Sequence, residues 1–489
     1  MIRHLCSVLV LIGLVAGCSS PRQGPPAAAP DLGRVLAGKV TADGMFVHLR
    51  ALQDIANANK GNRAAGTPGY DASVEYVAKA LRDKGFDVAT PQFDRLYAVS
   101  PGKPSLTIAG SSYPLDQASL LVRTPPGGLS GQPVKPTQPS GCAAGDYPAA
   151  LPAGAIAVVD DARCSVVDKQ NSARAKGAAA VIVVSTPTGE GAPPTLFTPG
   201  YYKQLTMPVA VVSSNGGSAL SHATAPVHLV LDAENIKITS RNVLAQTKTG
   251  STNDVIMVGA HLDGPRSGPG INDNGSGVAA VLETALQLGP LAPVNNAVRF
   301  VFWGADEDGL NGVMDYVFGL DDEQLNDIAM YLNFNLLGSP NAGFFTDDGD
   351  QSGPPGQGIA SADVPEGSAG IERTLSGYLN LAGKRPADMP LGTRTDYHPF
   401  MIAGVPIGGM STGASQLKSP VQARLWGGKA GVGYDPNFQS PRDTIDNINR
   451  EALAVMGSGV AYAAGSYAMS ISGANGVPLH DKRHRTRLP

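Results

Sequence analysis

Residues Val255–Gly277 read VIMVGAHLDGPRSGPGINDNGSG, and this stretch decides the fold. Its apolar run Val255–Gly259 is typical of a buried strand, and two further apolar runs follow along the chain at Val298–Trp303 and Tyr331–Phe334. A helical stretch, Gly277–Leu288, separates the first two. Near-continuous apolar strands that alternate with helices indicate a parallel sheet covered on both faces, as in α/β proteins.

Polar side chains follow each of these three strands. Those next to the strand ends are His261, Asp263, Asp306, Glu307 and Asn335. The loop Gly270–Gly277 adds Asp273 and opens a helix that Ser276 can cap. Parallel sheets bind their ligands beyond the carboxyl ends of the strands. One such residue alone is usually structural, but three clusters at three successive strand ends favour a functional site.

Length and composition narrow the class of protein. The chain has 489 residues, which predicts about three structural units. Its formal net charge is −4 and only 16% of residues are charged, which argues against a nucleic-acid-binding protein with a basic face. The hydrophobic content of 42% argues against a disordered chain and a multi-span membrane protein. The 60 glycines and 39 prolines indicate many loops.

The N-terminus has the features of an export signal. The apolar run Leu5–Ala16 suits the core of a signal peptide, assigned to residues 1–17. The ending Val15–Cys18 (VAGC) resembles a bacterial lipobox, so we expect lipidation of Cys18 and anchoring to the outer face of the bacterial cell membrane. The alternative is an ordinary secretory signal with an incidental cysteine. Residues 18–34 are expected to form the lipidated cysteine and a flexible tether.

From about Tyr97 to Ala233 the residue pattern changes to short runs of β-forming residues, which Pro and Gly interrupt. This block resembles a protease-associated domain, and residues 97–235 are assigned to it as an insert without chemistry of its own. Disulfides persist outside the cytoplasm, so we expect Cys142 and Cys164 to pair. The basic tail, residues 479–489, could touch anionic lipid, but we expect it to be solvated and frayed.

Further motifs lie downstream of the strand ends. The full set is Gly259–Asp263, Gly270–Gly277, Trp303–Leu310, Leu332–Asn335, Gly392–Phe400, Gly404–Pro406, Gly413–Ala414, Leu425–Gly428 and Tyr434–Asn449. Together they resemble the co-catalytic zinc aminopeptidases, most closely the LpqL-type lipoprotein aminopeptidases. The resemblance implies a zinc-exopeptidase-like, three-layer α/β/α fold with a mostly parallel central sheet, formed by residues 35–96 and 236–478.

The resemblance also implies a site with two zinc ions that share a bridging carboxylate. Its metal-ligand positions are His261, Asp273 (the bridge), Glu307, Asn335 and Gln439. Asp306 occupies the position of the general base, and Arg394 that of a residue that helps to hold the tetrahedral intermediate. Asp263 is expected to fix the tautomer of His261.

Four positions at this site depart from the family pattern. Asp306 stands for a glutamate, Asn335 for an aspartate and Gln439 for a histidine. Phe438 stands for a tyrosine, so a hydroxyl group that could support the intermediate is missing. Neutral amides are weaker zinc ligands than carboxylate or imidazole groups. Each of the two zinc ions would lose one strong ligand, so the affinity of both metal positions for zinc should fall. His398 is either a replacement ligand or a surface or supporting histidine.

Two functions therefore compete. The first is an exported aminopeptidase that releases N-terminal residues from peptides by metal-activated water, with a degenerate zinc site that reduces its activity. The second is a non-catalytic relative that binds a peptide or a partner. A single-metal hydrolase that uses His398 is a weaker third possibility.

Overall fold

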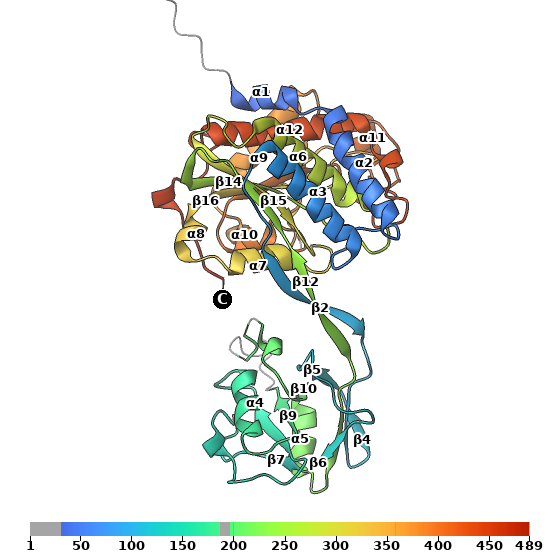
Figure 1. The fold of residues 1–489 in the computed structure, drawn as a ribbon, viewed down its shortest axis with the longest axis vertical. Helices are drawn as coiled ribbons and strands as arrows, with labels where there is room; N and C mark the ends of the chain where they lie inside the picture. The colour runs from blue at the N-terminus through green and yellow to red at the C-terminus, as the bar shows by residue number, and fades with distance from the viewer. Residues whose placement is uncertain (1–30, 186–195, 199, 357, 489) are drawn as a thin grey trace, which may run out of the picture.

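The computed structural model describes residues 31–185, 196–198, 200–356 and 358–488. The expected signal peptide, the expected lipidation site Cys18 and the tether up to Pro30 lie outside these residues. A large α/β body and a smaller insert are joined by a two-stranded ribbon (Figure 1). Within the described residues, none of the helices has the length and apolar character needed to cross a membrane.

The large body is built around an eight-stranded sheet. In spatial order its strands are β1 (Val88–Ala89), β13 (Val243–Gln246), β15 (Asn296–Trp303), β14 (Ser251–His261), β16 (Ile328–Phe334), β19 (Ile407–Ser411), β17 (Phe345–Asp347) and β18 (Ala387–Met389). The four central strands, β15, β14, β16 and β19, are parallel. Strand β13 is antiparallel to β15, and β17 is antiparallel to β19. The predicted mostly parallel sheet is confirmed, with antiparallel pairs toward its edges.

Helices cover both faces of this sheet. One face packs against α2 (Ala42–Ala58), α3 (Pro68–Lys84), α6 (Gly277–Leu288), α9 (Ser368–Leu381) and α12 (Arg450–Met469). The other packs against α7 (Asn311–Phe318), α8 (Asp322–Asp327) and α10 (His398–Ile402). Alternate residues of β14 separate the two cores, because Ile256 and Val258 point into the first and Val255 and Met257 into the second. The three layers follow from this alternation.

The N-terminal boundary differs from the expectation. Helix α1 (Leu32–Lys39) begins inside the stretch assigned to the tether, with Asp31 as its N-cap. It packs against α12 so closely that a Cβ atom on Gly33 would lie 2.2 Å from Ser466 Oγ. The absence of a side chain at Gly33 allows this approach, so the packed chain starts a few residues earlier than predicted.

The C-terminal tail also differs from the expectation, because it is docked rather than frayed. The guanidinium group of Arg483 is buried, pairs with Asp254 and donates to the carbonyl oxygens of Asn253 (2.8 Å) and Asn326 (2.7 Å). Arg485 donates to the carbonyl oxygen of Gly404 at 2.6 Å. Backbone carbonyl groups of the large body thus hold the basic side chains of the tail. The charge of the tail did not indicate these partners.

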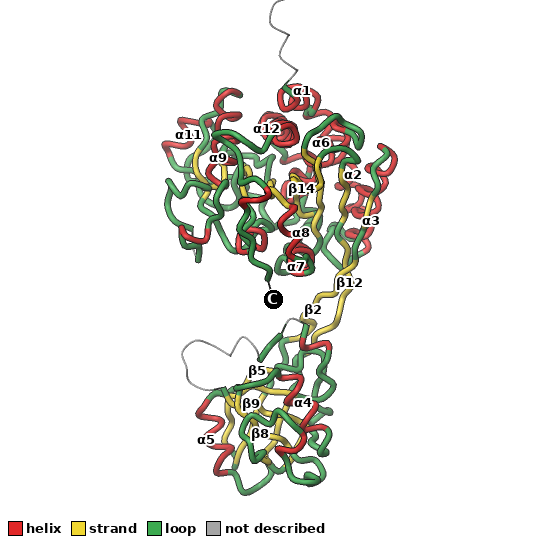
Figure 2. Tube along the Cα trace, turned by 90° about the vertical axis from the view of Figure 1, so that its left-hand side faces the viewer, coloured by secondary structure: helices red, strands yellow, loops and turns green. Residues whose placement is uncertain are grey.

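The insert is entered through β2 (Gln92–Ser100) and left through β12 (Glu234–Arg241), which pair with each other as an antiparallel ribbon. One of its sheets contains β5 (Leu115–Gln117), β10 (Val209–Val212), β9 (Ala180–Val184), β8 (Ile156–Asp160) and β7 (Pro133–Val134). The other contains β4 (Ser111–Tyr113), β3 (Ser105–Ile108), β11 (Val227–Val230) and β6 (Leu129–Gly131). Its helices are α4 (Val166–Arg174) and α5 (Ser214–His222), and Figure 2 shows them beside the strands. The predicted β-rich insert is confirmed.

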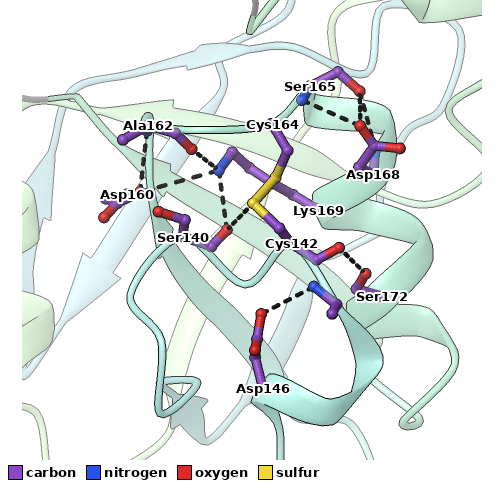
Figure 3. Close-up of a disulfide and its surroundings, with 11 residues drawn as sticks. Ser140, Cys142, Asp146, Asp160, Ala162, Cys164, Ser165, Asp168, Lys169 and Ser172 are labelled. Carbon is purple, nitrogen blue, oxygen red and sulfur yellow. Dashed lines mark hydrogen bonds and ion pairs between the residues drawn. A yellow bond between two sulfur atoms is a disulfide. The ribbon is translucent and has the colours of Figure 1, made fainter.

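A disulfide joins Cys142 to Cys164 in this insert (Figure 3). Beside it, the fully buried Lys169 donates from Nζ to the carbonyl oxygens of Ser140 (2.9 Å) and Ala162 (2.7 Å). The covalent link and the lysine therefore fix the same pair of loops, which lack a sheet of their own.

Candidate metal centre

The register of the sheet brings the polar residues to one edge. His261, the last residue of β14, pairs with Trp303, the last residue of β15, and Gly259 pairs with Asn333 near the end of β16. The three strands therefore end side by side. The loops that follow them carry Asp306, Glu307 and Asn335, as the sequence predicted.

His261 lies at the centre of this group and is only 3% exposed. Its Nε2 is 3.6 Å from Asp273 Oδ1 and 3.9 Å from Asp306 Oδ2. Burial alone would lower the pKa of His261, but the charges of Asp306 and Asp273 outweigh it and raise that pKa well above its ordinary value. The structure thus unites His261, Asp273 and Asp306, which are far apart in the chain.

Asp263 contacts His261 through its main chain, and its carboxylate holds the neighbouring loop. Its backbone carbonyl oxygen, not its carboxylate, is the close neighbour of His261 Nδ1, at 3.1 Å, whereas Asp263 Oδ1 is 3.8 Å away. The carboxylate instead accepts the backbone N–H groups of Asp306 (3.1 Å) and Glu307 (3.2 Å). Asp263 therefore holds the loop after β15 in place, while its main chain faces the imidazole ring.

The Asp273 segment, Ile271–Ser276, forms an irregular turn with non-helical backbone at Asp273 and Asn274, rather than the capped helix start that we expected. The Ser276 hydroxyl does not cap α6; it donates to the Asn272 carbonyl oxygen at 2.7 Å and accepts from the Leu337 N–H at 2.8 Å. The Asp273 N–H donates to Asp443 Oδ2 at 3.0 Å. These bonds occupy the backbone of the turn and leave the Asp273 carboxylate turned toward His261.

Arg63 supports the same loop and was missed by the sequence analysis. It is fully buried, and its guanidinium group donates to the carbonyl oxygens of Leu262 (2.6 Å), Pro269 (3.0 Å) and Gly270 (2.6 Å). Burial lowers its pKa to about 10. One side chain thus clamps both ends of the segment between His261 and Asp273. The only available signal was an arginine in a Gly-rich loop, which is usually exposed.

The centre has an excess of negative charge. Burial, with the charges of neighbouring acids, raises the pKa of Asp306 to about 7 and that of Glu307 to about 9. Four of the buried oxygen atoms without a hydrogen-bond partner in the described part of the chain belong to predicted site residues: Asp273 Oδ2, Asp306 Oδ1, Glu307 Oε1 and Asn335 Oδ1. Buried acceptors without donors are rare unless a cation or water pairs with them. A histidine nitrogen close to the carboxylates of Asp273 and Asp306, which keep unpaired oxygens, fits a divalent metal ion such as zinc.

Gln439 does not act as an acceptor in this arrangement. It is an exposed residue with φ of 49°, and its Nε2 donates to Glu307 Oε2 at 2.9 Å. The amide thereby occupies one oxygen of a predicted metal ligand. Phe438, next to it, is half-buried.

Two cavities adjoin the centre. One, of about 750 Å³, is lined by residues that include Asp306, Glu307, His398 and Gln439. The other, of about 370 Å³, is lined by residues that include Asn335. Arg394 is exposed and belongs to the walls of both. The half-buried His398 thus lies on the cavity wall, and burial lowers its pKa.

A mostly parallel sheet with a His–carboxylate centre at its strand ends and cavities above it is the arrangement of a metal-dependent hydrolase. Family models and curated relatives identify the class. Residues 242–464 match the model of peptidase family M28, and residues 129–220 match that of the PA domain. The chain belongs to peptidase family M28, with a PA domain inserted in it.

Named relatives are similar over nearly the whole chain. A probable lipoprotein aminopeptidase, LpqL of Mycobacterium tuberculosis, is 46% identical over 98% of this chain and 97% of its own length. An aminopeptidase of Pseudomonas aeruginosa is 39% identical over 88% of this chain and 81% of its own. The solved zinc aminopeptidase BSAP of Bacillus subtilis is 23% identical, with a TM-score of 0.49, and covers 89% of this chain and 97% of its own.

Proposed function

We propose that this protein is an exported zinc aminopeptidase that releases the N-terminal residue of peptides. The observation that carries the proposal is the His261–Asp273–Asp306–Glu307 centre, in which Asp306 and Glu307 have unpaired buried oxygens and line the 750 Å³ cavity. The names of the M. tuberculosis and P. aeruginosa relatives support the same reaction.

His261, Asp273, Glu307 and Asn335 would hold the metal. Their donor set, one imidazole with carboxylate and amide oxygens, suits zinc, and bound zinc supplies an activated water and polarises the substrate carbonyl group. Asp443 and Arg63 keep the Asp273 turn rigid through its backbone, so these side chains are positioned before substrate arrives.

Asp306 is suited to move the proton. Burial raises its pKa, which makes the carboxylate a better acceptor for a proton from the attacking water, and the proton can then pass to the leaving amine. The carboxylate of Asp263 fixes the Asp306 N–H, which keeps the Asp306 side chain within 3.9 Å of His261. Asp306 is therefore the proposed general base.

Arg394 is suited to stabilise charge that develops on the substrate. It lies on the shared wall of both cavities, where its guanidinium donors can reach an oxyanion. No second donor comes from position 438, because phenylalanine lacks a hydroxyl group. Arg394 thus takes a larger share of this task than it would beside a tyrosine.

We also propose that the site binds zinc more weakly than one with aspartate at 335 and histidine at 439. Asn335 brings a neutral oxygen, and Gln439 brings a neutral amide whose Nε2 donates to Glu307. Activity should be correspondingly reduced. The competing function, binding of a peptide or partner without hydrolysis, makes the opposite prediction of no turnover at full zinc loading.

One experiment tests the function. The mature protein is loaded with zinc and assayed on aminoacyl p-nitroanilides, with chelator and with zinc restored. Chelator-sensitive release of p-nitroaniline supports the proposal. If the zinc-loaded protein is inactive while the triple variant Asn335→Asp, Gln439→His, Asp306→Glu is active, the natural chain is a binding protein on a peptidase scaffold.

Membrane anchoring is tested separately. Lipidation at Cys18 would tether the body through the segment that precedes α1, and the name of the M. tuberculosis relative is consistent with it. Cys18→Ala should move the exported protein from the membrane fraction to the soluble fraction. Cys6→Ala, within the expected signal peptide, is the matched control and should leave the protein at the membrane.

A further inference from the structure

The 370 Å³ cavity beside the metal centre has a buried carboxylate in its wall. Asn335 and Arg394 connect this cavity to the proposed site, and apolar groups form much of its wall, including Leu336, Met389 and Met410. Asp347, the last residue of β17, also lines it. A mainly apolar cavity with one acidic group is suited to a long side chain that carries a charge at its tip.

Asp347 is unpaired although it is buried. It is 8% exposed, and no hydrogen bond or ion pair of its carboxylate is found among the described residues. The carboxylate lies over the backbone of β19, where a Cβ atom on Gly409 would come within 2.7 Å of Asp347 Oδ2. Since unpaired charges are costly to bury, this carboxylate has an unused capacity to bind a cation.

The groups around Asp347 make the inner part of the cavity acidic. Glu372 of α9 faces it, and with burial this charge raises the pKa of Asp347 to about 7. Asp396 and Tyr397 approach from the segment before α10. The cationic group found in the cavity wall among the described residues is Arg394, which is exposed and therefore solvated. A cationic ligand would therefore meet net negative charge and little water in the inner part of the cavity.

We propose that this cavity receives the side chain of the substrate's N-terminal residue, and that Asp347 selects substrates with a basic residue, lysine or arginine, at that position. The inference rests on the proposed aminopeptidase function and adds the substrate class. The methylene groups of the basic side chain pack against Leu336, Met389 and Met410. Its ammonium or guanidinium group pairs with the Asp347 carboxylate, which keeps the carboxylate ionised.

The test compares lysyl and norleucyl p-nitroanilides, which differ in the terminal amino group. For the zinc-loaded natural protein we expect a kcat/KM at least tenfold higher for the lysyl substrate. Asp347→Asn should remove this preference. Its kcat/KM for the norleucyl substrate should stay within about threefold of that of the natural protein, because aspartate and asparagine have nearly equal volumes. Asp350→Asn is the matched control, because Asp350 is an exposed acid in the loop that follows β17, three residues after Asp347, and should preserve the preference.

Binding of lysinamide and norleucinamide, measured by calorimetry, separates this inference from the proposed function. If no substrate is cleaved, the aminopeptidase proposal fails, but lysinamide binding that Asp347→Asn abolishes would still support a cation-selective cavity. Equal kcat/KM for both substrates in the natural protein, or a lysyl preference that Asp347→Asn leaves intact, overturns the assignment of Asp347.

Discussion

Gln439 Nε2 donates a 2.9 Å hydrogen bond to Glu307 Oε2, so two residues at predicted metal-ligand positions bind each other. Replacement by histidine would free this oxygen and add an imidazole ligand. We therefore predict that Gln439→His tightens zinc binding at least tenfold, on the order of one ligand's contribution. Competition with a chromophoric chelator measures the affinity.

The control for that variant is Gln416→His, which adds a histidine at an exposed position in the wall of the neighbouring cavity. It should leave zinc affinity unchanged. Equal affinities for the natural protein and Gln439→His would show that position 439 does not contact the metal.

Asp306 is predicted to be essential for turnover but not for metal binding. Asp306→Asn keeps the size of the side chain and removes the proton acceptor, so kcat should fall by about 10²–10⁴. Zinc content and melting temperature should remain close to those of the natural protein. The variant Asp308→Asn, in the same loop, is the comparison, and a similar loss of kcat in both would argue against a specific role for Asp306.

Arg63→Met is predicted to destabilise the fold and loosen the metal loop. It leaves three buried carbonyl groups without their donor, at a cost of about 3 kcal/mol in the free energy of unfolding. Urea denaturation measures this cost. Arg50→Met, at an exposed position in α2, should change stability by less than about 0.5 kcal/mol.

The disulfide is predicted to stabilise the insert. Cys142 and Cys164 are 22 residues apart, and a loop of this length corresponds to about 3 kcal/mol of entropic stabilisation. The double variant Cys142→Ser, Cys164→Ser should unfold in the insert at lower temperature, while melting of the large body is retained. Hydrogen exchange resolves the two parts. Two reactive thiols in the unreduced natural protein would contradict the pairing.

Stability should depend on pH through Asp347. Burial raises its pKa from 3.8 to about 7, so between these pH values the folded state keeps a proton that the unfolded chain has lost. This contribution makes the protein less stable as pH rises from about 4 to 7, by about 4 kcal/mol at most. Asp347→Asn lacks it. The melting temperature of this variant relative to the natural protein should therefore be higher at pH 8 than at pH 4.5, and a pH-independent difference would contradict the prediction.

The sequence predicted the central sheet and the strand-end cluster because both depend on local pattern. Continuous apolar runs indicated β14, β15 and β16, and polar residues at their ends had to meet once the strands were parallel. The short strands β17 and β18, at one end of the sheet, have no such pattern, so Asp347 was not recognised as a residue of the cavity wall.

The other differences come from contacts distant in sequence. Arg63 finds its partners about 200 residues away, and Arg483 finds Asp254 and neighbouring carbonyl groups across the fold. The hydroxyl of Ser276 is taken by Leu337 instead of its own helix. Periodicity and capping rules concern near neighbours in the chain, so they could not anticipate these bonds.

The paired ribbon β2–β12 has a consequence for how this protein could change over time. Because the strands that enter and leave the insert are neighbours, Ala98 opposite Asn235, the large body is complete on one side of a single crossing point. A gene rearrangement could replace the whole insert between β2 and β12 with a tight turn, and the eight-stranded sheet would stay intact. Loss of equal, even numbers of residues from both strands would shorten the arm and preserve which side chains face each way.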